Sequence, residues 1–100
     1  MFDEVIPMTA TEHVVITVTG QDRVGIVAGV SRILSEHNVN IVDISQTILQ
    51  GIFAMILLVD VAAANRDLIA LQETLTAAGK DLGVRIVVQH EDIFRYMHRI

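Results

Sequence analysis

The chain has 100 residues, of which 52% are hydrophobic and 4% aromatic, and its formal net charge is −5. This length fits one domain, and so aliphatic a composition excludes intrinsic disorder. The acidic balance argues against nucleic acid as a partner, because nucleic-acid-binding proteins present a basic surface. Cysteine is absent, which excludes disulfides and thiolate chemistry.

The start of the sequence has no feature of a secretion signal, since the first residues carry no basic cluster. The longest apolar run, Ile52 to Val59, is far shorter than the roughly 20 residues of a membrane-spanning helix. We therefore expect a soluble cytoplasmic protein with no membrane partner.

The N-terminal half of the sequence predicts a strand, a helix and a second strand. Residues 1–12 show no hydrophobic period and are expected to form a poorly ordered leader. From His13 onwards apolar and polar residues alternate, as in a strand with one buried face. Gly25 to His37 has the three- and four-residue apolar spacing of an amphipathic helix, which Asn38 ends. Val39 to Leu49 is the second extended run.

The C-terminal half predicts two further strands and a second helix. Gln50-Gly51 supplies a tight turn in which glycine accepts a positive φ, and Ile52 to Val61 is the third strand. Asn65 is expected to cap the second helix, which Gly83 ends. Val84 to Gln89 is the fourth strand.

The order β-α-β-β-α-β over residues 13–89 predicts an α+β, ferredoxin-like fold. In this fold a four-stranded antiparallel sheet carries both helices on one face, and residues 90–100 add a short C-terminal helical extension. The third strand is apolar on both faces, so leaving one face in water would forfeit about 6–12 kcal/mol of hydrophobic stabilisation. We expect the leader, the extension or another subunit to cover it.

The loop between the first strand and the first helix is the candidate ligand site. Its glycines allow close backbone approach, and the N-terminus of the helix can receive a carboxylate. Asn40 is expected at the same edge of the sheet, where its side chain can hold an ammonium group. The predicted ligand-binding residues are Gly20, Gln21, Asp22, Arg23, Val24, Gly25, Ile26 and Asn40.

A purely structural interpretation of this loop stays open. Asp22 then caps the helix instead of contacting a ligand, and Arg23 is solvated instead of pairing with an acid across a dimer. A phosphate loop is excluded because Ile26-Val27 stands where that motif needs lysine and a hydroxyl. No catalytic residues, metal ligands or cofactor are predicted, since the sequence lacks the patterns that such sites require.

The segments Thr19-Gly20-x-Asp22-Arg23-x-Gly25-Ile26-Val27 and Val39-Asn40-Ile41 resemble the ACT domain, a small ligand-sensing module. The segment Ile41 to Thr47 and the tail from Gln89-His90-Glu91-Asp92-Ile93-Phe94 through Met97-His98-Arg99-Ile100 are similar to those of small stand-alone ACT-domain proteins. This resemblance implies a ferredoxin-like fold that forms a homodimer. It also implies an amino-acid effector bound near the first loop, at a subunit interface.

These observations predict a small regulatory protein that binds an amino acid or a similar effector allosterically, and that is not an enzyme. The alternative is a ligand-free interaction module that regulates a partner protein. In that case the loop is structural, and the second apolar face of the third strand docks on the partner.

Overall fold

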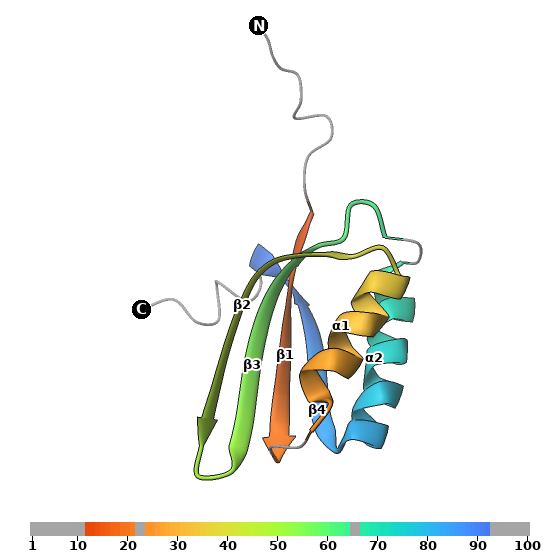
Figure 1. Cartoon of the computed structure of the whole chain (residues 1–100). Coiled ribbons are helices and arrows are strands. Elements are labelled where there is room, and N and C mark those ends of the chain that lie inside the picture. The colour runs from red at the N-terminus through yellow and green to blue at the C-terminus, as the bar shows by residue number, and fades with distance from the viewer. Residues whose placement is uncertain (1–11, 22–23, 65–66, 93–100) are drawn as a thin grey trace, which may run out of the picture.

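The computed structural model describes residues 12–21, 24–64 and 67–92. The elements, in chain order, are β1 (His13–Gln21), α1 (Ile26–Glu36), β2 (Asn40–Leu49), β3 (Ile52–Asp60), α2 (Leu68–Leu82) and β4 (Val84–His90). This βαββαβ order confirms the predicted ferredoxin-like fold (Figure 1). The predicted leader, apart from Glu12, and the C-terminal extension beyond Asp92 lie outside the described residues.

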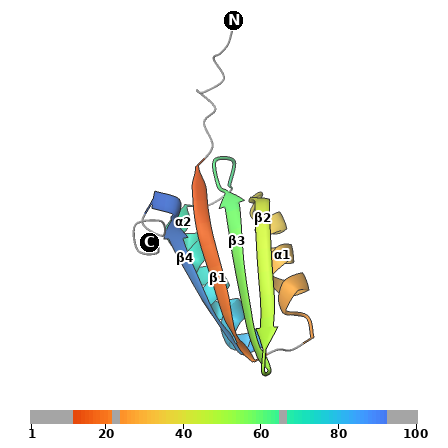
Figure 2. The ribbon, with the colours of Figure 1, turned by 90° about the vertical axis from the view of Figure 1, so that its left-hand side faces the viewer.

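The four strands form one antiparallel sheet in the order β2-β3-β1-β4. Both helices pack on the same face of this sheet, and Figure 2 shows the opposite face, which α1 and α2 leave uncovered. The two edges are therefore β2 and β4. This arrangement follows from the sequence, because each crossover helix has one apolar stripe to bury.

Short stretches of left-handed backbone end the helices and close the hairpin. Asn38 follows α1 with φ 59°, and the Val39 N–H donates to the Leu34 carbonyl at 2.9 Å. Gln50 and Gly51 both have positive φ, of 51° and 82°, as a two-residue hairpin turn requires. The sequence predicted both features, and both are confirmed.

The N-terminal cap of α2 differs from the prediction. Asp67, not Asn65, is the cap residue, and its carboxylate accepts a hydrogen bond of 2.8 Å from the Ala70 N–H. An acidic side chain in this position satisfies a free N–H of the first turn, which stabilises the helix. Gly83 ends α2 with φ 76°, as predicted.

The core lies between the sheet and the two helices. Its largest fully buried side chains come from β1, β3 and both helices, and among them are Ile16, Ile26, Leu34, Met55, Leu57, Leu71 and Leu75. In β3, the residues Phe53, Met55, Leu57 and Val59 face this core, whereas Ile52 and Ile56 on the other face are 60% and 44% exposed. The expectation that β3 is apolar on both faces is confirmed.

None of the helices in the described part of the chain is both long and apolar enough to cross a membrane.

Candidate functional site

The loop between β1 and α1 leads into the N-terminus of α1. Gly25 is the N-cap residue, with φ 94°, and the first helical hydrogen bond runs from the Gly29 N–H to its carbonyl at 2.8 Å. Gly25 offers no side-chain acceptor, and the first turn of α1 contains no acidic residue. Among the described residues, nothing therefore offsets the positive end of the α1 dipole. Asp22 and Arg23 lie outside the described residues, so their predicted roles stay predictions.

The two glycines of this loop are needed for different reasons. A Cβ on Gly25 would meet no atom within 4 Å, so its left-handed backbone alone favours glycine. A Cβ on Gly20 would lie 2.8 Å from the Gly83 carbonyl oxygen. Glycine is therefore needed at position 20 because β1 passes close to the start of β4. The sequence had suggested a different reason, which was the close approach of a ligand to the backbone.

Asn40 does not lie beside this loop in the same chain, so that prediction is wrong. Asn40 is in register with Asp60, which is also in register with His13 at the start of β1. Gly20, in contrast, is in register with Phe53 at the other end of β3. The reason is the direction of α1, which returns the chain to the start of β1 before β2 begins (Figure 1).

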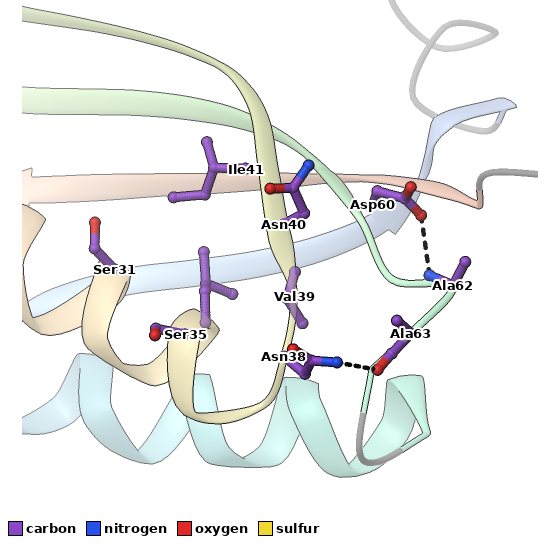
Figure 3. A pocket seen from close by; sticks show the side chains of 10 residues that line it. Ser31, Ser35, Asn38, Val39, Asn40, Ile41, Asp60, Ala62 and Ala63 are labelled. Atoms are coloured by element: carbon purple, nitrogen blue, oxygen red, sulfur yellow. Dashed lines mark hydrogen bonds between the residues drawn. The ribbon is translucent and has the colours of Figure 1, made fainter.

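Asn40 instead lines a groove of about 440 Å³ between α1, the start of β2 and the segment after β3 (Figure 3). The polar side chains of this lining are Ser31, Ser35, Asn38, Asn40 and Asp60, and no basic side chain contributes. The groove is therefore rich in oxygen acceptors, to which the negative end of the α1 dipole adds.

Hydrogen bonds fix the walls of the groove. Asn38 donates from Nδ2 to the Ala63 carbonyl at 2.8 Å, which ties the end of α1 to the segment after β3. Asp60 Oδ1 accepts from the backbone N–H of Ala62 at 3.0 Å and of Glu12 at 3.2 Å. These two donors, Ala62 first, lower the pKa of the Asp60 carboxyl below its ordinary value. Asp60 is thus an anion at neutral pH.

Sequence reasoning missed this groove because its residues come from segments far apart in the chain. The only local signal was the Asn38-Val39-Asn40 triplet, in which two amides flank a buried valine.

Elsewhere in the described ranges, His13 Nδ1 lies 3.3 Å from Glu91 Oε1. No cluster of three potential metal ligands occurs among the residues that the structure describes.

Comparison with known proteins identifies the class. A family model described as the ACT domain matches residues 12–89. Among solved structures, an ACT domain protein from Streptococcus pneumoniae is 40% identical, with a TM-score of 0.74 over 84% of this chain and 94% of that chain. A putative glycine cleavage system transcriptional repressor is 28% identical, with a TM-score of 0.68 over 80% of this chain and 46% of that one. The chain therefore belongs to the ACT domain family, whose members are regulatory, ligand-binding domains.

Within that family the chain is similar to the UPF0237 proteins. One from Methanocaldococcus jannaschii is 60% identical over 88 residues, which are 88% of this chain and 98% of that relative. The expected resemblance to small stand-alone ACT-domain proteins is confirmed.

Proposed function

We propose that this chain is a regulatory protein that binds an amino acid or a similar small effector at a site built by two copies. The observation that carries this proposal is the separation of two complementary features. The positive N-terminus of α1 lies at one end of the domain, and the acceptor-rich groove at Asn40 lies at the other. A free amino acid carries a carboxylate and an ammonium group, so it needs both features together.

An antiparallel pairing of β2 with the β2 of a second copy brings the two features together. β2 is an edge strand, and Ile44 and Ile48, on the face that β3 turns to the helices, are 40% and 57% exposed. In a pairing centred on Gln46, Ile44 of each chain lies opposite Ile48 of the other, which removes both side chains from water. The same symmetry places Asn40 at the end of the second copy's sheet where its Gly20-to-Gly25 loop lies.

The chemistry of each half fits one group of the effector. Backbone N–H groups at the start of α1, next to the exposed Gly25, are suited to a carboxylate. Asn40 and the ionised Asp60 of the second copy are suited to an ammonium group, since both offer oxygen acceptors. Gln21 and Val24 border the loop half of the site and are exposed.

The mechanism is linkage between binding and association. An effector that contacts both chains stabilises one dimer geometry and thereby changes the affinity for a partner protein, by about 1–3 kcal/mol. Such a protein needs no cofactor, metal or catalytic residue, and we propose a binding protein and not an enzyme.

The test is thermal unfolding of the purified protein with each common amino acid in turn. Glycine belongs in this panel because one similar protein is described as a putative glycine cleavage system transcriptional repressor. A ligand at 100 times its Kd adds about 2.7 kcal/mol to the free energy of unfolding, and each kcal/mol raises Tm by about 4–8 °C in a domain of this size. No shift with any amino acid would contradict the sensor function.

A second candidate function rests on the open face of the sheet. Ile52 and Ile56 are exposed there, on the face that α1 and α2 leave uncovered. This favours an interaction module in which that face docks on a partner protein without any effector. Ile56→Glu then abolishes regulation in cells while Asn40→Ala leaves it intact, and the opposite result favours the effector site.

A further inference from the structure

The two edges of the sheet differ in whether their backbone groups are free. At the β4 edge, the side-chain amide of Gln72 on α2 bonds to the strand. Its Oε1 accepts from the Val88 N–H at 2.8 Å, and its Nε2 donates to the Ile86 carbonyl at 3.1 Å. A further bond of 2.8 Å from Nε2 to Thr76 Oγ1 holds the amide in place.

These two bonds reproduce the contacts of an added strand. In a parallel sheet, a residue bonds to the two residues that flank the one opposite it on the neighbouring strand. It donates its N–H to the carbonyl of the preceding residue, and its own carbonyl accepts from the N–H of the following residue. The Gln72 amide makes the same pair of bonds to Ile86 and Val88, on either side of Val87. Two outward groups in the middle of this edge, the Val88 N–H and the Ile86 carbonyl, are therefore already occupied and are not available to another chain.

The β2 edge has no such cover. The hairpin turn at Gln50-Gly51 makes Leu49 and Ile52 a hydrogen-bonded pair, so alternate residues of β2 direct their N–H and C=O groups away from β3. At Ile44 the outward N–H donates to the exposed carboxylate of the adjacent Asp43 at 2.8 Å, which is a contact within the strand and not a cover from another element. Across the described residues, the outward groups of Gln46 and Ile48 have no partner.

We propose that Gln72 closes the β4 edge, so that a second copy of this chain pairs only through β2 and assembly by sheet extension stops at two chains. This inference rests on the homodimer of the proposed function. Its physical basis is the difference between a closed and an open assembly. One open edge pairs with itself around a two-fold axis, whereas two open edges on opposite sides of a domain generate an unlimited chain of subunits.

The test is sedimentation velocity of Gln72→Ala over a range of protein concentrations, beside the wild type. We expect the weight-average mass of the variant to rise roughly twofold or more above that of the wild type as concentration increases. Thr76→Ala is the matched control, because it removes one contact of the amide but keeps both bonds to β4. In the double variant Gln72→Ala/Gln46→Pro, where proline removes an outward N–H of β2, growth should stop at two chains.

A folded Gln72→Ala protein with the wild-type mass at every concentration would overturn the proposal. If that variant fails to fold, hydrogen exchange in the wild type decides. A slow Val88 amide supports the Gln72 bond, and exchange at the rate of an unprotected amide contradicts it.

The failure of the homodimer gives a different result. A monomeric wild type would contradict the dimer in the proposed function. Gln72→Ala should then change from one chain to two through β4, which would still support the role of Gln72.

Discussion

Asn40 and Gly20 lie at opposite ends of the same sheet, since Asn40 is in register with Asp60 and Gly20 with Phe53. One chain therefore offers its acceptor-rich groove and its positive helix N-terminus in two separate places. Any ligand that needs both must lie between two chains, and the first prediction follows from this relationship.

Asn40→Ala should weaken the binding of the effector that the amino-acid panel identifies. Losing a hydrogen bond to a charged group costs about 1.5–3 kcal/mol, which corresponds to roughly a 10- to 150-fold rise in Kd. Isothermal titration calorimetry measures this change. Ser45→Ala, also on an exposed part of β2, is the control and should bind as the wild type does. Equal Kd values for the two variants would remove Asn40 from the site.

Gly25→Ala should lower the free energy of unfolding by about 1–2 kcal/mol, because an L-residue at φ 94° is strained. Gly51→Ala is a matched comparison, since Gly51 also has positive φ and open space around its Cα. Urea denaturation should show similar losses for both variants. Effector binding should fall only for Gly25→Ala, and an equal fall for both would indicate a general effect of destabilisation.

Asp60 should make the stability depend on pH in the acid range. Its pKa is lowered in the folded protein by the N–H groups of Ala62 and Glu12, so its stabilising contribution is complete above the ordinary value of 3.8. As the pH falls through the lower, folded-state pKa, this contribution is lost. Asp60→Asn keeps an oxygen acceptor but no charge. The stability difference between wild type and Asp60→Asn, measured by urea denaturation, should be constant above pH 3.8 and shrink below it. A difference that grows on acidification would contradict the assigned hydrogen bonds.

Leu57→Ala and Ile56→Ala should separate the two faces of β3. Leu57 is completely buried in the core, so its truncation should cost about 2–5 kcal/mol. Ile56 is 44% exposed on the open face and should cost clearly less. Chemical denaturation of the two variants measures this contrast. Equal losses would show that something covers the open face in the folded protein.

The order and type of the elements were predictable because hydrophobic spacing changes clearly between strands and helices along this sequence. The hairpin at Gln50-Gly51 and the helix ends at Asn38 and Gly83 were predictable for a local reason, since each needs a residue that accepts positive φ. The cap of α2 was placed at Asn65 and not at Asp67 because both residues are good caps and only the geometry distinguishes them.

The candidate site was less predictable because its position depends on the direction in which α1 runs as well as on residue type. Placing Asn40 correctly required following α1 back along β1, after which β2 starts beside His13 and not beside Gly20. Gln72 gave no signal either, since a glutamine on an amphipathic helix is expected simply to face water. Its bonds to Ile86 and Val88 arise only once α2 lies over β4.

The placement of Asn40 far from its own loop has a consequence for how the proposed sensor responds in a cell. A site made by two chains does not exist in a lone chain, so the apparent affinity for the effector depends on how much of the protein is present. Dilution of the protein then lowers the apparent affinity for the effector, and raised expression increases it, with no change in the effector itself. The response threshold is set jointly by the effector and by the abundance of the protein that detects it.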